Sequence, residues 1–382
     1  MDPLFILLAS GGLIVFGSLL ASSVAEALQY HYSDTFIAAI IALLQTLPEY
    51  AFVVVLTIKG EAQLAIASII GANILLIGLG FPLVVFIGYL AKAKGIREDK
   101  SLDLMRENSI ESIFLAISGA YMIYMGFKGY IDMLDSIILL GMFIVYIFAV
   151  TRLPPEIEVE KPHGLARYFL NRKKLSAIMI VVSILLIWYP AELFTDKLVG
   201  FASGWLNPVL LVAFVAPLVS EMPEKLTAYI GATKNEDMAR LGICNFMSSK
   251  INNGTLLFSS MFIVAYATGI SNGIAINSAQ YPHLDYLLIL AGFLTLLAAF
   301  TTIDRRITMV ESFVLIILYG FLIHALAYQS ELIYAIIITA FLAFVIAIYA
   351  IKDKRFLWLS DLKYSIELIK KRDKTTLEGQ NT

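Results

Sequence analysis

The sequence predicts an all-α integral membrane protein with ten core transmembrane helices, arranged as two inverted five-helix repeats, plus one extra C-terminal transmembrane helix. Three observations predict this fold. The 382 residues are 59% hydrophobic, above the roughly 45–50% apolar share of soluble domains. Eleven apolar stretches are long enough to cross about 30 Å of hydrocarbon as helices. Finally, two distant pairs of motifs recur at nearly the same spacing.

The apolar stretches follow one another closely along the chain. A transmembrane helix needs about 20 mainly apolar residues. The first stretch has no basic residue before it, unlike a cleavable signal peptide, so we expect it to remain in the mature protein. The eleven stretches cover residues 4–29, 35–58, 62–91, 109–127, 131–151, 175–200, 205–231, 237–268, 285–303, 307–327 and 331–351.

The distribution of basic residues predicts the orientation in the membrane. If the N-terminus lies outside, most of the 28 lysine and arginine residues fall in inward-facing connections and in the C-terminal tail. Positive charge gathers on the cytoplasmic side of membrane proteins. Losing one span would invert every later connection, so this asymmetry also supports the count of eleven. We therefore predict a multi-pass cell-membrane protein with its N-terminus outside and its C-terminus in the cytoplasm.

Two pairs of matching segments indicate an internal repeat. Leu47-Pro48-Glu49 recurs 175 residues later as Met222-Pro223-Glu224, and residues 131–136 match residues 307–312 at an offset of 176. A repeat unit with five spans must enter the membrane in the opposite direction the second time. Two such units related by an axis in the membrane plane form the architecture of many secondary transporters.

This repeat divides the chain into five parts. The connection between the two halves is rich in proline and charge, as expected of a cytoplasmic linker. The predicted parts are the first repeat (1–151), the cytoplasmic linker (152–174), the second repeat (175–327), the additional transmembrane helix (328–351) and a basic cytoplasmic tail (352–382). For that tail we expect mainly a solvated, positively charged segment.

The repeated proline and glutamate indicate an ion pathway at membrane depth. Proline breaks the helical hydrogen-bond ladder and frees carbonyl groups one turn earlier. An acid within a span is costly unless it holds a cation or a proton. Carboxylates beside free carbonyls suit hard cations such as calcium, which takes six to eight oxygen ligands. Softer metals prefer thiolates or imidazoles, and the chain has only one cysteine and four histidines.

The segments around the two breaks form a longer pattern. In the first half, Gln45-Thr46-Leu47-Pro48-Glu49 is followed in the next span by Ala67-Ser68-Ile69-Ile70-Gly71-Ala72-Asn73. In the second half, Ser220-Glu221-Met222-Pro223-Glu224 is followed by Cys244-Asn245 through Ser248-Ser249-Lys250, with two extra residues between break and helix. Asn253 then takes a position that would line a site.

This pattern resembles the sodium/calcium exchanger family of the cation/calcium antiporter superfamily. That family has two α-repeats, each with a G-T-S-x-P-E type break and a following G-N-x-x-G-S-N type helix. The resemblance covers about residues 4–327 and implies ten core helices in inverted halves. The ion ligands that the motifs and the resemblance suggest are Glu49, Glu224, Glu221, Thr46, Gln45, Ser220, Asn73, Ser249 and Asn253.

Departures from the family pattern concern the coupling ion. Gln45 and Glu221 stand where the family has hydroxyl residues, and Ala72 also replaces a serine. Lys250 has no counterpart in the usual pattern. Three acids offset by Lys250 leave a net charge of −2, which one divalent cation or two protons neutralise. Lys250 is therefore a candidate charge-compensating residue that replaces a sodium ion, with structural ion pairing or snorkelling as the alternative.

The function predicted from these observations is secondary antiport, without enzymatic activity or a cofactor. Calcium or a similar divalent cation is exchanged against sodium or protons by alternating access, with the ion bound by Glu49 and Glu224. Magnesium or manganese exchange with proton coupling, an ion channel and an intramembrane enzyme are the alternatives. The enzyme is disfavoured because the sequence has no nucleophile or metal-binding histidine motif. The expected partners are inorganic cations and the lipid bilayer, not nucleic acid.

Overall fold

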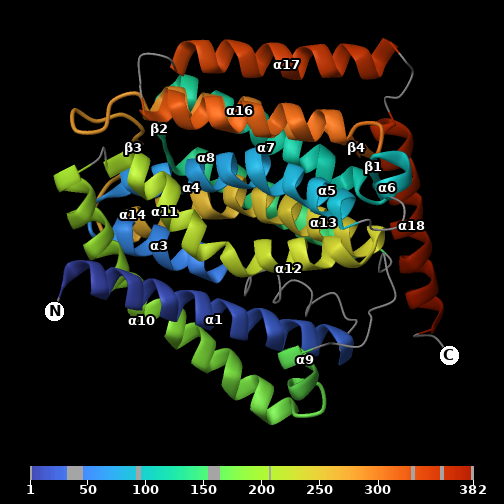
Figure 1. The fold of residues 1–382 in the computed structure, drawn as a ribbon, viewed down its shortest axis with the longest axis horizontal. Coiled ribbons are helices and arrows are strands. Elements are labelled where there is room, and N and C mark those ends of the chain that lie inside the picture. Colours follow the sequence, from blue (N-terminus) through green and yellow to red (C-terminus); the bar gives the residue numbers. More distant parts are fainter. Residues whose placement is uncertain are drawn as a thin grey trace.

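The computed structural model describes residues 2–31, 46–91, 96–153, 164–205, 208–327, 332–352 and 357–379. Long helices dominate these residues and run side by side across the molecule (Figure 1). In the first half they are α1 (Pro3–His31), α3 (Leu47–Ile58), α4 (Ala62–Leu75), α5 (Phe81–Leu90), α6 (Ile96–Asp99), α7 (Ser109–Lys128) and α8 (Met133–Val150).

The second half also consists mainly of long helices. The short helix α9 lies in the predicted linker, and two helices follow the second half at the C-terminal side. The bounds are α9 (Gly164–Phe169), α10 (Lys173–Trp205), α11 (Pro208–Ser220), α12 (Met222–Lys234), α13 (Glu236–Asn252), α14 (Phe258–Ala267), α15 (Leu284–Thr301), α16 (Met309–Ala327), α17 (Leu332–Lys352) and α18 (Trp358–Gly379).

Six of the described helices are long and apolar enough to cross a membrane. Four shorter apolar helices belong to other predicted spans. Every predicted stretch is mostly helical where the structure describes it, apart from a bend at Glu221 and strand residues at the starts of the fifth and tenth stretches. The beginning of the second stretch, residues 35–45, lies outside the described residues. The six long helices cover Pro3–Ala21, Ala62–Leu90, Ser109–Lys128, Met133–Val150, Lys174–Phe201 and Leu284–Thr301.

The predicted proline breaks are confirmed as helix boundaries. Helix α3 begins at Leu47, with Pro48 in its first turn, where a missing backbone N–H costs nothing. In the second half, α11 ends at Ser220 and α12 begins at Met222, so that Glu221 lies at the junction. Each break therefore places its glutamate in the first turn of a new helix within an apolar region.

Two π-helical segments interrupt the helices that follow the breaks. The segment η1 (Leu76–Gly80) joins α4 to α5, and η2 (Asn253–Leu257) joins α13 to α14. The two segments start 177 residues apart. A π-helical turn widens the helix and frequently lies at a functional site.

Two small antiparallel sheets connect the halves at opposite ends of the helices (Figure 1). Strand β1 (Ser101–Asp103) pairs with β4 (Arg306–Thr308), and β2 (Tyr130–Ile131) pairs with β3 (Ile274–Ala275). Each sheet therefore combines one strand from the first half with one from the second. Strands of two or three residues give too short an alternation to be predicted from sequence.

Glycine residues bring the two halves together in the middle of the fold. A Cβ atom added at Gly119 of α7 would lie 2.9 Å from the Gly292 carbonyl oxygen, and one at Gly292 of α15 would lie 2.7 Å from the Gly119 oxygen. These helices are in backbone contact, as is common where small residues line a helix interface in membranes. The contact is reciprocal, because each glycine makes room for the other helix.

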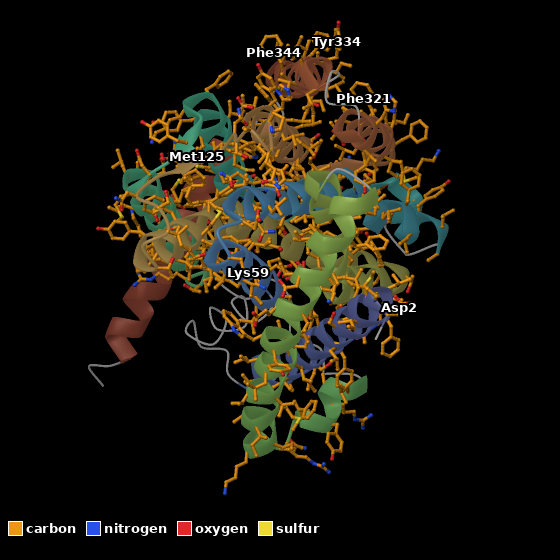
Figure 2. All side chains as sticks on the ribbon, turned by 90° about the vertical axis from the view of Figure 1, so that its left-hand side faces the viewer. Asp2, Lys59, Met125, Phe321, Tyr334 and Phe344 are labelled. Carbon is orange, nitrogen blue, oxygen red and sulfur yellow. The ribbon has the colours of Figure 1, made fainter. Side chains whose placement is uncertain are left out.

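Peripheral helices flank this core on two sides. Helices α1 and α10 pack along each other on one side and α17 lies on the other (Figure 1). Figure 2 shows Tyr334 and Phe344 of α17 pointing away from the molecule, and both are more than 60% exposed. Such large apolar side chains suit contact with lipid. On the opposite side, Lys59 after α3 forms ion pairs with Glu192, at 3.6 Å, and with Asp196 of α10.

The C-terminal tail contains the helix α18, which packs against the end of the helical core. Its Asp361 is fully buried and forms ion pairs with Arg106, at 3.2 Å, and with Arg305, at 2.9 Å. Trp358 packs on Phe300, with 5.8 Å between the ring centroids. This packed segment differs from the solvated tail that we expected. Asp361 therefore connects one arginine from each half.

We expect Asp361→Ala to release α18 from the core. Hydrogen bonds to charged groups contribute about 1.5–3 kcal/mol when buried, and less here because both arginines are partly exposed. Hydrogen exchange of residues 358–369 should become at least tenfold faster. Glu367→Ala removes an exposed acid from the same helix and serves as the control. Equal exchange in both variants would contradict the role given to Asp361.

Candidate ion-binding site

Three glutamates from the two breaks are near enough to one another to interact electrostatically. Glu49 is 5% exposed, Glu221 is 1% exposed and Glu224 is half-buried. Glu224 interacts electrostatically with both Glu221 and Glu49, and Glu49 interacts with Glu221. Glu49 and Glu224 lie in the first turns of α3 and α12, where the helix dipole partly offsets the cost of a buried negative charge. The two breaks thus bring their acids into one region.

Two lysines share the third acid. The Lys225 Nζ atom donates to Glu221 Oε2 at 2.9 Å, and Lys250 Nζ lies 3.7 Å from Glu221 Oε1. All three side chains are almost completely buried. Our sequence analysis missed Lys225, although its position four residues after Glu221 on one helix face is a recognisable signal. With Lys225 included, the net charge of this region is −1, so the value of −2 was wrong.

The helices that follow the two breaks contain buried, neutral polar side chains at the positions that the sequence pattern indicated. Asn73 in α4 is fully buried and its Nδ2 group donates to the Ile69 carbonyl oxygen at 3.2 Å. Asn253, in the π-helical segment η2, is 1% exposed, and Ser249 is 3% exposed. Asn73 lies three residues before η1 and Asn253 is the first residue of η2, so the wider turns occur close to buried polar groups.

Many polar atoms in this region lack a hydrogen-bond partner among the described residues. Buried polar groups are normally satisfied, and exceptions call for an explanation such as a bound ion. Leaving them unpaired costs about 1–3 kcal/mol per group, and more for charges. The unpartnered atoms are Glu49 Oε2, Glu221 Oε1, Asn73 Oδ1, Ser249 Oγ, Lys250 Nζ, Asn252 Oδ1, and both Nδ2 and Oδ1 of Asn253.

The remaining predicted ligands lie at the breaks themselves. Thr46, the residue before α3, is 3% exposed, and Ser220 at the end of α11 is 4% exposed. The Ser220 hydroxyl donates weakly to the Pro217 carbonyl oxygen at 3.5 Å. Gln45 lies outside the described residues. Within the described ranges, no three Asp, Glu, His or Cys side chains converge as a metal site, so a cation here would need neutral oxygens in addition to carboxylates.

A separate cleft lies where α4, α11 and α16 meet. Its lining includes Gly71, Ala213 and Tyr319, and it contains no charged side chain. None of the three glutamates lines this cleft.

These features define a membrane protein whose broken helices hold acids in its centre, the class to which cation exchangers belong. The sodium/calcium exchanger protein family model matches this chain twice, over residues 3–152 and 175–328. The chain therefore belongs to the sodium/calcium exchanger protein family, as the sequence motifs suggested. No curated protein matches it.

Solved structures of cation exchangers have the same fold. The crystal structure of the H⁺/Ca²⁺ exchanger CAX is similar with a TM-score of 0.83 and 24% identity, over 97% of this chain and 92% of that one. The sodium-calcium exchanger NCX_Mj, soaked with Na⁺ and Sr²⁺, is similar with a TM-score of 0.56 and 17% identity, over 85% of this chain and 98% of that one. A second NCX_Mj structure, soaked with Na⁺ and Ca²⁺, is similar with a TM-score of 0.56 and 18% identity, over 85% of this chain and 99% of that one.

Proposed function

We propose that this protein is a secondary antiporter that exchanges calcium for protons, with Glu49 and Glu224 as the acids for which both ions compete. The observation that carries this proposal is the pair of mutually repelling carboxylates at the breaks of α3 and α12. Two such carboxylates are stable in a packed interior when one divalent cation or two protons neutralise them. Loading with either ion therefore excludes the other.

The neutral ligands in this proposal come from both halves. Thr46, Ser220, Asn73, Ser249 and Asn253 supply hydroxyl and amide oxygens, and Gln45 remains a candidate. Calcium accepts such mixed oxygen shells, whereas magnesium demands near-ideal octahedral geometry. We assign Glu221 to the two lysines rather than to the transported ion, because both of its oxygens already face an ammonium group.

Protons are the preferred coupling ion for two reasons. Gln45, Ala72 and Glu221 replace hydroxyl residues of the sodium-coupled pattern, which removes neutral oxygens that a sodium ion would need. The larger similarity of fold is to an H⁺/Ca²⁺ exchanger, and the smaller one is to a sodium-calcium exchanger. Protons need only the carboxylates themselves.

Alternating access through two inverted five-helix repeats is the proposed mechanism. The repeated match of one family model, the two π-helical segments and the two sheets at opposite ends support this arrangement. In such folds the halves move relative to each other around a central site. We further propose that residues 328–351 form the eleventh span and that the N-terminus lies outside, as the basic residues indicate.

Uptake into proteoliposomes tests the proposed function. A tenfold proton gradient, inside acidic, should drive ⁴⁵Ca²⁺ accumulation at least tenfold above that of protein-free vesicles, and an equal sodium gradient should not. Magnesium and manganese in parallel assays identify the preferred divalent ion. Flux that ignores both gradients indicates a channel and would overturn the proposal. Sodium-driven uptake would replace protons as the coupling ion.

A further inference from the structure

The two halves carry different side chains at equivalent positions beside the acids. At the offset of 175 that relates Glu49 to Glu224, Thr46 corresponds to Glu221 and Tyr50 corresponds to Lys225. Asn73 and Lys250 each lie three residues before a π-helical segment, so these two residues also correspond. Three neutral side chains of the first half are thus replaced by three charged side chains in the second.

These three charged residues form a connected group, which we call the charged triad: Glu221, Lys225 and Lys250. Glu221 lies between the two ammonium groups, with Nζ to oxygen distances of 2.9 Å for Lys225 and 3.7 Å for Lys250. The side chains of Glu221 and Lys250 are fully buried, and Lys250 Nζ has no hydrogen-bond partner among the described residues. One acid and two lysines leave the triad with one positive charge in excess.

The excess positive charge of the triad acts on Glu49 and Glu224, the two acids proposed to bind the transported ions. Lys250 and Lys225 interact electrostatically with Glu49 and with Glu224. A fixed ammonium group in a low-dielectric interior is not screened as it would be in water. A further cation entering this region would meet the triad as well as the two acids, whereas the neutral side chains of the first half present no such charge.

We propose that the charged triad acts as a permanently bound monovalent cation that sets the ion stoichiometry. This inference rests on the proposed function. Glu49 and Glu224 then bind cations with a total charge of +2, which means one divalent cation or two monovalent cations. A third monovalent cation is excluded. Exchange is therefore electroneutral, and the loaded protein carries the same charge in both directions.

The wild-type protein gives the first test, which needs no variant. In proteoliposomes with a clamped membrane potential, the steady-state calcium ratio should change about 100-fold for each tenfold change in proton ratio. An imposed potential of about 59 mV, which corresponds to a factor of ten for one charge, should leave that ratio unchanged. A tenfold change in the calcium ratio at this potential would overturn the inference and leave proton-coupled exchange intact. Absence of calcium uptake would instead refute the proposed function.

Substitutions within the triad give the second test. Lys250→Asn restores the residue of the first half and removes the excess charge, so a third cation can bind. The calcium ratio should then change about 1000-fold for each tenfold proton ratio and about tenfold for each 59 mV. Unchanged, voltage-independent exchange by this variant would overturn the inference.

Two further variants complete the design. The double variant Glu221→Thr with Lys250→Asn rebuilds the neutral pair of the first half and keeps one excess charge on Lys225. Its exchange should stay voltage-independent, which also covers the case in which Lys250→Asn alone fails to fold. Voltage-dependent exchange by the double variant would overturn the role of the excess charge. Lys234→Asn, at an exposed position of α12, is the matched control and should behave as the wild type.

Discussion

Replacing Glu49 or Glu224 by glutamine is expected to reduce proton-driven calcium uptake more than 100-fold. Glutamine has the shape of glutamate but lacks the charge, so a divalent cation loses one of its two charged ligands. The remaining amide oxygen is a much weaker ligand for a hard cation. Because the two acids are proposed to act as one site, the double variant should lose little more than either single variant, in the way that residues of one functional unit are non-additive.

Stability measurements separate this role from a structural one. Glu49 Oε2 has no hydrogen-bond partner within the described residues, so removing the charge should leave the protein at least as stable as the wild type in the absence of calcium. Calcium should raise the unfolding temperature of the wild type, because a ligand that binds only the folded state stabilises it. It should not raise that of Glu49→Gln.

Glu311→Gln provides the control for these measurements. Glu311 is also an acid near the start of a helix, but its carboxylate accepts hydrogen bonds from the backbone N–H and the hydroxyl of Thr308, both at 2.8 Å. Glutamine can still accept both bonds through its amide oxygen, but without the charge that strengthens them, so the substitution should lower stability slightly and leave the calcium-induced rise in unfolding temperature. If Glu49→Gln lowered stability in the same way and retained calcium binding, Glu49 would have a structural role only.

The sequence was sufficient to predict the breaks because their chemistry is local. Pro48 cannot continue a helical ladder from the preceding span, and the structure begins α3 next to it. The same argument predicted a break within residues 220–224, and in the structure Glu221 lies between the end of α11 and the start of α12. Repetition of the pattern then indicated that the two acids lie together, since an internal repeat relates equivalent positions through an axis.

Features that depend on contacts between distant segments could not be predicted in this way. The spacing of four residues places Lys225 within reach of Glu221, but only the fold shows that both side chains are buried together. The docked helix α18 depends on Asp361 meeting Arg106 and Arg305, which come from different halves. The β1–β4 and β2–β3 pairs likewise join segments too short to carry a periodic signal.

Gly71→Ala is expected to have the second large effect, through the packing of α4 on α11. A Cβ atom at Gly71 would lie 1.7 Å from the Ala213 carbonyl oxygen and 2.4 Å from its carbonyl carbon. Both are backbone atoms, so a rotamer change cannot relieve the clash and α11 must move. Overpacking of this kind typically costs about 1–3 kcal/mol, and we expect the upper end of that range, with a lower unfolding temperature.

This displacement should also reduce transport at least tenfold, because α11 ends at Ser220, directly before Glu221 and the first turn of α12. Gly141→Ala in α8 is the matched control, since a Cβ atom there meets nothing within 4 Å. Alanine has the higher helix propensity, by about 1 kcal/mol, so this variant should be slightly more stable and transport normally. If Gly71→Ala matched it in unfolding temperature and calcium uptake, close contact between α4 and α11 would not be what positions the acids.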